Sequence, residues 1–255
     1  MRLFDTHAHY DADAFDADRM EVLSSMPGQG VELILNPGCD LKSSQTAVEL
    51  AERFPFAYAA VGVHPEECAD WNAEHDIPVL EALAQNPKVR AIGEIGLDYH
   101  WPENPPRELQ QQAFHAQLEL AEKLDLPVIV HDRDAHHDCL DIVRAHPNVT
   151  GVYHCYSGGV EDAKTLMKLG WMISFTGSIT FKNARRALEV IDLLPLDRMM
   201  IETDSPYMSP EPFRGRRNDS GRVHLVAEAI ARRKGLDPEE VARITLENGK
   251  RFFRI

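Results

Sequence analysis

The sequence has few cysteines, no long apolar run and no excess of positive charge, and each absence excludes a class of protein. Its 4 cysteines lie far apart without a CxxC pair, which argues against a zinc ribbon and a secreted disulfide framework. Nowhere do about 18 apolar residues follow one another, so neither a membrane-spanning helix nor a membrane partner is predicted. The amino-terminal segment becomes polar within a few residues, which argues against a secretory signal. We therefore expect a cytoplasmic protein.

The balance of charge is acidic. The chain carries 27 Lys and Arg against 41 Asp and Glu, a formal net charge of −14. Because tight non-specific binding to duplex nucleic acid depends on neutralising phosphates, this balance argues against a duplex binder. It still permits a small or single-stranded substrate to enter a locally positive pocket.

Length and composition describe a globular protein. The chain has 255 residues, of which 44% are hydrophobic and 27% charged, and it contains no low-complexity stretch or Gly/Ser linker. A chain of this size buries roughly 70 to 75% of its unfolded surface, so it needs no disulfide or structural metal to fold. We predict one domain over residues 1–255 and expect any bound metal to be functional.

Short apolar runs alternate with segments of helical spacing along the whole chain. Helical spacing is clearest over 109–124 and 140–145, and a last helix is predicted from Pro238 to about Phe252 with Asp237 as its N-cap. The alternation predicts an α/β fold, specifically a (β/α)₈ TIM barrel of the metal-dependent hydrolase type. The predicted strands cover 2–4, 31–35, 57–63, 89–92, 127–130, 151–153, 171–175 and 198–201.

In such a barrel the chemistry lies at the carboxyl ends of the strands, and here those ends are rich in histidine and acid. His7 and His9 follow the first strand two residues apart, so on an extended chain both imidazoles would point the same way, toward one metal ion. Taken alone, the pair could equally be two strand-end histidines without a ligand.

Four further residues close apolar runs: Glu94, His131, His154 and Asp204. Each histidine alone could be a satisfied core side chain, and each carboxylate could pair with an arginine or lysine. If the strand register holds, however, all of them converge with the first two histidines on one face of the barrel. Mixed imidazole and carboxylate ligation suits Zn²⁺, Mn²⁺, Co²⁺ or Fe²⁺, with Mg²⁺ possible at a carboxylate-rich position.

Six ligands are more than one catalytic ion normally takes. We therefore predict two divalent ions, Zn²⁺, Mn²⁺ or Mg²⁺, about 3.5 to 4 Å apart. Glu94, on a strand between the others, is predicted to bridge them.

Taken together, the strand-end motifs resemble the TatD family of metal-dependent hydrolases, a branch of the amidohydrolase-like barrels, over nearly the whole chain. The motifs are Asp5-Thr6-His7-Ala8-His9, Gly62-Val63-His64-Pro65, Gly93-Glu94-Ile95-Gly96-Leu97-Asp98-Tyr99, His131-Asp132-Arg133-Asp134-Ala135-His136, His154-Cys155-Tyr156-Ser157-Gly158-Gly159 and Glu202-Thr203-Asp204-Ser205-Pro206-Tyr207. The resemblance implies a nuclease or other hydrolase, with His64 facing a substrate phosphate. It also implies a metal pair held by His7, His9, Glu94, His131, His154 and Asp204.

The chain departs from the family pattern at two places. Asp132 stands where relatives often carry serine, and this extra carboxylate could simply be solvated. The stretch from Arg217 to Gly221 stands where the family usually continues Arg-Asn-Glu-Pro. Because that loop is expected to shape the substrate rim, the second departure bears mainly on the choice of substrate.

A metal-bound water can ionise near neutral pH, so the chemistry requires no serine or cysteine nucleophile. Asp204 is predicted to orient that water and accept its proton, and Glu202 to assist. Glu94 joins them as the third catalytic carboxylate. The alternative for Glu202 is a supporting contact with an arginine at the rim.

Basic and aromatic residues near the predicted mouth are candidates for substrate contacts. Arginine matches phosphate bidentately, and an unstacked base can rest on an aromatic ring. Each of these side chains could equally be solvated or simply packed. The predicted substrate-binding residues are His64, Arg133, Tyr156 and Arg217, from a wider set that includes Lys182, Arg185, Arg186, Arg214, Arg216, Tyr99, Trp101 and Tyr207.

The leading hypothesis is a deoxyribonuclease or exonuclease that uses a metal-bound hydroxide on single-stranded DNA ends or short nucleotides. An alternative keeps the metals but cleaves an amide or ester, including the aminoacyl ester of tRNA. A third, an idle barrel that serves as a scaffold, would predict a missing ligand, and every proposed ligand is present. The expected partner is DNA or a nucleotide, and the expected assembly is a monomer or small homo-oligomer.

Overall fold

Eight parallel strands form one sheet in chain order, from β1 to β8, in the computed structural model, which describes residues 1–255. Each strand pairs in parallel with the next. The predicted α/β class and TIM barrel are confirmed. The strands are β1 Leu3–Asp5, β2 Val31–Pro37, β3 Ala57–Val61, β4 Val89–Asp98, β5 Val128–Arg133, β6 Gly151–Tyr153, β7 Met172–Phe175 and β8 Met199–Ile201.

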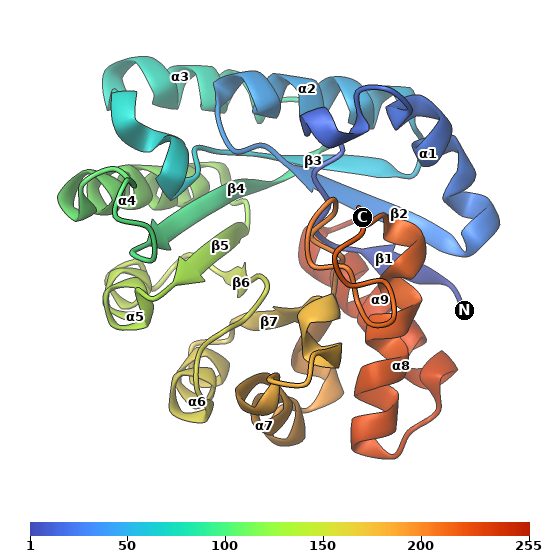
Figure 1. Ribbon diagram of the computed structural model, residues 1–255. Coiled ribbons are helices and arrows are strands. Elements are labelled where there is room, and N and C mark those ends of the chain that lie inside the picture. The colour runs from blue at the N-terminus through green and yellow to red at the C-terminus, as the bar shows by residue number, and fades with distance from the viewer.

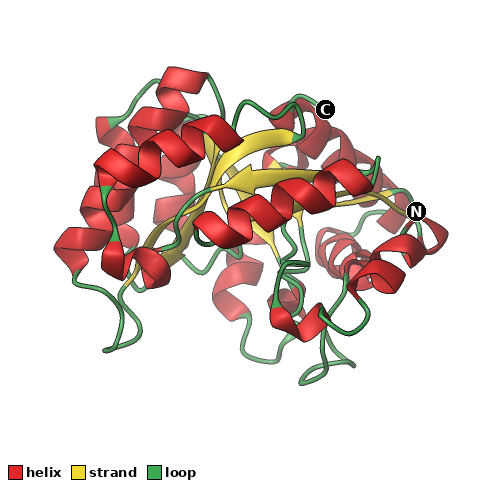
Figure 2. Ribbon diagram, turned by 90° about the horizontal axis from the view of Figure 1, so that it is seen from above, coloured by secondary structure: helices red, strands yellow, loops and turns green.

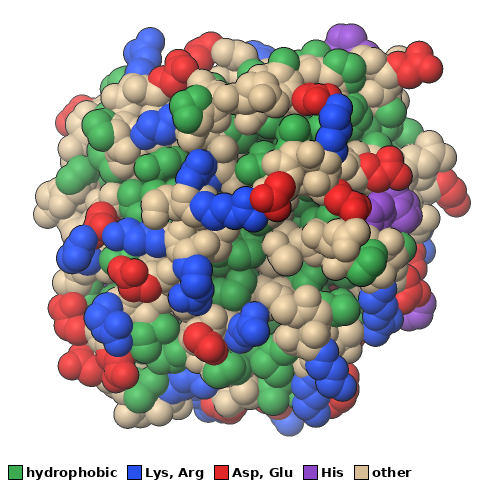
Figure 3. All heavy atoms as spheres, turned by 180° about the vertical axis from the view of Figure 1, so that it is seen from behind, with side chains coloured by type: hydrophobic (Ala, Val, Ile, Leu, Met, Phe, Trp, Pro, Cys, Tyr) green, Lys and Arg blue, Asp and Glu red, His purple; other side chains and the backbone are tan.

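Helices alternate with the strands and cover the outside of the barrel (Figures 1 and 2). None of them is both long and apolar enough to cross a membrane. On the face in Figure 3, basic and acidic side chains are interspersed. The α-helices are α1 Arg19–Ser25, α2 Leu41–Arg53, α3 Ala73–Leu83, α4 Arg107–Leu124, α5 His136–Ala145, α6 Val160–Lys168, α7 Arg185–Leu193, α8 Val223–Lys234 and α9 Pro238–Phe253. Short 3₁₀ helices are η1 Asp13–Phe15, η2 Pro27–Gln29, η3 Pro65–Asp70, η4 Gly177–Thr180, η5 Leu196–Arg198 and η6 Ser220–Arg222.

The core has two parts, because successive side chains of a strand point to opposite faces of the sheet. The larger part fills the space between the sheet and the helices. The smaller part takes a residue from every strand, as expected of a barrel interior, and includes Leu246 and Phe253 of α9. α9 therefore closes the barrel on the side of the strand beginnings and leaves the other end for the site.

The seam between β8 and β1 is closed just beyond the strands. Thr6 donates a backbone hydrogen bond to Ile201 (3.2 Å), and Asp204 donates one to the carbonyl of His7 (2.9 Å). The barrel is thus nearly closed, and the segment after β1 lies beside the segment after β8. This seam brings the first and last predicted ligands together.

β4 differs most from its prediction. It was expected to end at Ile92 but continues to Asp98, because its polar residues remain extended and paired with β5, for example Gly96 beside His131. β5 likewise continues to Arg133. Smaller differences of one or two residues occur in other strands, and α5 begins at 136 rather than 140. The predicted cap of α9 is confirmed.

Candidate active site

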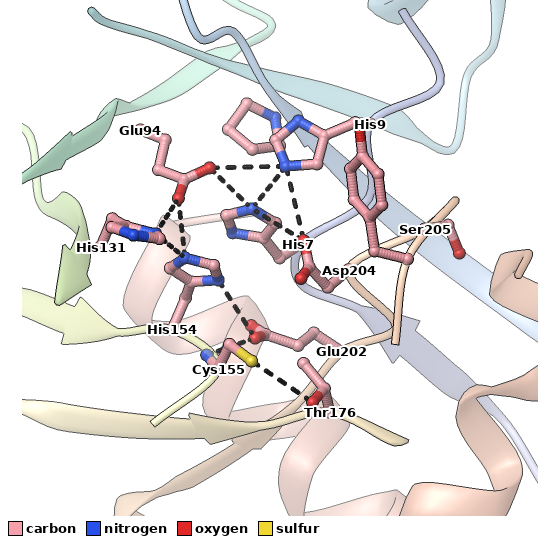
Figure 4. A network of polar contacts seen from close by, with 12 residues as sticks. His7, His9, Glu94, His131, His154, Cys155, Thr176, Glu202, Asp204 and Ser205 are labelled. Atoms are coloured by element: carbon pink, nitrogen blue, oxygen red, sulfur yellow. Dashed lines mark hydrogen bonds and ion pairs between the residues drawn. The ribbon is translucent and has the colours of Figure 1, made fainter. Parts of the chain in front are cut away.

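The structure brings all six predicted ligands together at the carboxyl ends of the strands (Figure 4). Two lie just after β1, one within β4, one within β5, and one each just after β6 and β8. Five are buried, and one imidazole, that of β5, is partly exposed. The six are His7, His9, Glu94, His131, His154 and Asp204.

Glu94 lies at the centre, and its two carboxylate oxygens serve different histidines. Oε1 lies 2.7 Å from Nε2 of His154 and 3.0 Å from Nδ1 of His131. Oε2 lies 3.1 Å from Nε2 of His7 and 3.4 Å from Nε2 of His9. The carboxylate therefore stands between two groups of imidazoles.

Asp204 completes the second group. Its Oδ1 lies 3.6 Å from Nε2 of His9 and 3.9 Å from Nε2 of His7. These two Nε2 atoms are themselves 3.0 Å apart. The backbone of Asp204 is left-handed, with a φ of 56°, at the turn that follows β8.

The outer nitrogens of two histidines face carboxylates. Nε2 of His131 lies 3.0 Å from Oδ2 of Asp98, and Nδ1 of His154 lies 3.4 Å from Oε1 of Glu202. Carboxylates beside these outer nitrogens favour a proton there, so each inner nitrogen facing Glu94 is free to bind a cation or to carry a second proton. An imidazole lone pair and a carboxylate oxygen this close need a cation or a proton between them.

The donor set therefore fits divalent cations. His7, His9 and Asp204 offer donor atoms within 4.8 Å of one another, and His64, Glu94 and His131 form a second such group. Neutral imidazole and carboxylate are ligands that Zn²⁺, Mn²⁺ and Fe²⁺ accept. Carboxylates behind the histidines are the usual means of orienting metal ligands.

Electrostatics keep both inner carboxylates ionised. Burial opposes the charge on Glu94, but the imidazoles around it, His154 foremost, hold its pKa well below the ordinary value. Burial also opposes the charge on Asp204, and the nearby imidazole of His9 lowers its pKa. Both side chains are therefore anionic donors at neutral pH.

His64 is a neutral member of the cluster. Burial, together with the nearby His131, lowers its pKa to about 4. Its Nδ1 accepts a hydrogen bond from the backbone of Glu66 (3.2 Å), so the proton sits on Nε2, 3.3 Å from Oε1 of Glu94. In this tautomer Nε2 is a hydrogen-bond donor rather than a metal ligand.

Glu202 reaches the cluster from behind His154. Besides its contact with that imidazole, its Oε1 accepts a hydrogen bond from the backbone of Cys155 at 2.6 Å (Figure 4). Since Nδ1 and Nε2 lie on opposite sides of the ring, Glu202 stands on the side away from Glu94. It is placed to orient His154.

Two supporting residues were missing from the sequence prediction. Asp98 was noted in its motif but given no role, although Glu94 and Asp98, four apart on one strand, must share a face. That alternation could have identified it. Cys39, whose Sγ lies 3.8 Å from Nδ1 of His9, follows β2 without any sequence signal.

The predicted substrate-binding residues are scattered. Arg133, at the end of β5, is partly buried with its guanidinium over the ring of Trp101, 5.6 Å from the centroid. Tyr156 is only 6% exposed and donates its hydroxyl proton to the carbonyl of Gly159 at 3.0 Å. It is packed in the core, so the structure does not bring it to the cluster.

Arg217 is also turned away. Its guanidinium makes two hydrogen bonds with the carboxylate of Asp18, at 2.8 and 2.6 Å, and lies over the ring of Phe15. A guanidinium hydrogen-bonded along its edge and covered by a ring has little freedom to reach a substrate. The structure thus places His64 in the cluster and Arg133 at the end of the strand that carries His131, but it brings neither Tyr156 nor Arg217 to the cluster.

Comparison with known proteins agrees with this geometry. The family model described as TatD related DNase matches residues 4–254. The chain is 44% identical over 255 residues to the uncharacterized metal-dependent hydrolase YabD of Bacillus subtilis (strain 168), covering 99% of each chain. It is 33% identical over 262 residues to the 3′-5′ ssDNA/RNA exonuclease TatD of Salmonella typhimurium (strain LT2), again covering 99% of each.

A solved structure resembles the whole barrel. The crystal structure of the TatD homologue YJJV from Escherichia coli K12 superposes with a TM-score of 0.93 at 31% identity, covering 100% of this chain and 98% of the other. Sequence, fold and donor set therefore agree. The chain belongs to the TatD family of metal-dependent hydrolases, enzymes that act on ester bonds.

Proposed function

We propose that this protein hydrolyses phosphodiester bonds at the ends of single-stranded DNA or in short nucleotides, using two divalent ions. The observation that carries the proposal is the division of Glu94, whose Oε1 and Oε2 face different imidazoles. A carboxylate placed between two groups of donors would be shared by two metal ions, one held by each group. The exonuclease name of the relative from Salmonella typhimurium supports the choice of substrate.

The roles of the ions and of the histidines follow from the donor set. Bound divalent ions lower the pKa of a coordinated water and neutralise phosphate charge. His7, His9 and Asp204 would hold one ion, and His131 and His154 the other. Asp98 and Glu202 keep His131 and His154 in the tautomers that direct lone pairs inward.

Two residues have direct roles toward the substrate. Asp204, ionised and at the edge of the cluster, would orient the attacking water and accept its proton on its carboxylate. His64, neutral with its proton on Nε2, donates a hydrogen bond to a phosphate oxygen. A neutral hydrogen-bond donor suits this position because, unlike a second cation, it does not compete with the metal ions for the carboxylate ligands.

The test is cleavage of a 5′-labelled single-stranded oligonucleotide by metal-stripped protein reloaded separately with Mg²⁺, Mn²⁺ or Zn²⁺. We expect wild-type protein to bind about two ions per chain and to shorten the oligonucleotide only when metal is present. This shortening should be lost in Asp204→Asn. The ladder of products also gives the direction of attack. No shortening with any ion, while two ions still bind, would refute the phosphodiester substrate and favour an amide or ester.

A further inference from the structure

The loops around the candidate active site carry an uneven distribution of charge. Between each strand and the next α-helix, the first six loops, residues 6–18, 38–40, 62–72, 99–106, 134–135 and 154–159, contain no lysine or arginine. They do contain acids in all but the last. Every basic loop residue lies in the last two loops, 176–184 and 202–222: Lys182, Arg214, Arg216, Arg217 and Arg222.

Some of these cations are already neutralised. Arg217 pairs with Asp18 at 2.6 Å, and Arg222 lies 3.7 Å from Asp219. Four others make no ion pair within 4.0 Å and are exposed: Lys182, Arg186 in the first turn of α7, Arg214 and Arg216. We call these four residues the β7–β8 rim. One exposed acid, Glu211, lies in the same two loops and also makes no ion pair.

The two loops that carry the rim are packed against each other. The backbone of Glu211 donates a hydrogen bond to Oγ1 of Thr180 at 2.9 Å. The guanidinium of Arg214 lies over the ring of Phe181, 4.3 Å from its centroid. Lys182 directly follows this ring, so cations of both loops share one surface.

An exposed ring lies beside the cluster, in one of the two loops that carry the rim. Tyr207 is 58% exposed, and its ring centroid is 6.5 Å from that of His9. It belongs to the same loop as Arg214 and Arg216, and Asn218 fixes it by donating a hydrogen bond to its carbonyl at 2.8 Å. A base on this ring would stand beside the cluster, on the loop that also carries Arg214 and Arg216.

We propose that a single strand of nucleic acid bound at the active site continues across the β7–β8 rim. Its phosphates contact Lys182, Arg186, Arg214 and Arg216, and a base stacks on Tyr207. The first six loops carry acids but no lysine or arginine, so the rim, with its four unpaired cations, is the favoured route. The inference rests on the proposed function, because it takes the strand to be the substrate of the same site.

Binding tests the route separately from cleavage. A fluorescein-labelled oligodeoxynucleotide of about 20 residues is titrated by anisotropy at several KCl concentrations, using Asp204→Asn protein loaded with Mn²⁺. Reversing two charges, Arg214→Glu with Arg216→Glu, should weaken binding at least tenfold. The slope of log K against log[KCl] should also become shallower, by about 0.7 for each phosphate contact that is lost.

A matched control changes the same net charge elsewhere. Arg232 in the last turn of α8 and Arg243 in α9 are exposed and unpaired, so Arg232→Glu with Arg243→Glu should leave affinity within twofold. Equal weakening in the rim and control variants would overturn the route, as would an absence of oligonucleotide binding. Tyr207→Ala should weaken binding without changing the salt dependence.

Cleavage assays test the proposed strand route and the proposed function separately. These assays use proteins that keep Asp204. The ratio of kcat/KM for the long oligonucleotide to kcat/KM for a dinucleotide should be at least tenfold lower in the rim variant than in wild type. An unchanged preference overturns the route. If wild-type protein cleaves neither substrate, the proposed function fails, and the anisotropy titration still decides whether the rim binds a strand.

Discussion

Asp5 at the end of β1 accepts two hydrogen bonds from Thr203, the second residue after β8. The backbone N–H of Thr203 donates to Oδ1 at 2.8 Å, and its hydroxyl donates to Oδ2 at 2.5 Å. Both residues are buried. Since His7 and Asp204 are their near neighbours in the chain, the contact that closes the barrel also aligns two ligands.

Thr203→Val should therefore destabilise the fold. The substitution keeps the shape but removes the hydroxyl, leaving Oδ2 of Asp5 buried without its donor. We expect the free energy of unfolding to fall by about 1 to 3 kcal/mol, measured by urea denaturation of metal-free protein. Thr150→Val, at an exposed loop position, should change it by less than about 0.5 kcal/mol. Equal effects would show that the contact contributes nothing to closure.

Much of the fold follows from hydrophobic pattern alone, and the exceptions have a physical cause. β6 has its predicted bounds because a short apolar run ends in His154. β4 was predicted too short because Glu94 and Asp98 interrupt the apolar run. Those side chains point to the mouth of the barrel, where a polar group in a strand finds partners.

The cluster itself was foreseeable, since strand ends of a barrel must meet. The orientation of neighbouring side chains was not. Cys155 adopts a φ of 41°, which interrupts the extended backbone after His154, and Tyr156 lies in the core. Arg217 is engaged by Asp18, 199 positions away, a pairing that no local pattern indicates.

Asp98→Asn should weaken metal binding while preserving the fold. The carboxylate holds His131 at Nε2, and an amide there no longer favours one tautomer of the ring. We expect the affinity for Zn²⁺ or Mn²⁺ to fall about 10- to 100-fold, measured by calorimetry. Glu103→Gln, an exposed acid in the loop after β4, should bind as wild type does. Wild-type affinity in Asp98→Asn would remove its supporting role.

His136 should titrate above its ordinary pKa. Its Nδ1 lies 2.8 Å from Oδ2 of Asp132, and this hydrogen bond raises its pKa against the opposing effect of burial. Asp162 adds a smaller increase, and Arg186 a smaller decrease. In an NMR titration Asp132→Asn should lower the pKa, whereas Asp141→Asn, exposed on α5, should leave it in place.

The pair of His136 and Asp132 should also make the stability of the fold depend on pH. Because the pKa of His136 is higher in the folded state than in the unfolded state, its contribution is complete below the ordinary value of 6.5. It is lost as the pH rises through the folded-state pKa. The free energy of unfolding of wild type should therefore exceed that of Asp132→Asn by more at about pH 6 than at about pH 9. These two pH values lie just below and well above the ordinary pKa of histidine. An advantage that grows with pH would contradict the pairing.

Gly96→Ala should disturb the cluster through the backbone. Gly96 has a φ of 139°, and a Cβ there would lie 2.0 Å from the carbonyl oxygen of His131. β4 and β5 must separate to admit it, which moves the imidazole that lies 3.0 Å from Glu94. We expect a loss of more than about 2 kcal/mol of stability and a weaker affinity for Mn²⁺.

Gly170 provides the control for that substitution, because it shares a positive φ, 82°, but has open space around its Cβ position. Gly170→Ala should cost only the strain of a left-handed alanine, about 1 to 2 kcal/mol, and leave metal affinity unchanged. Urea denaturation and calorimetry of both variants separate the two causes. If both alanines reduce metal affinity alike, general destabilisation explains the loss; if Gly96→Ala alone does, the close approach of β4 and β5 sets the position of His131.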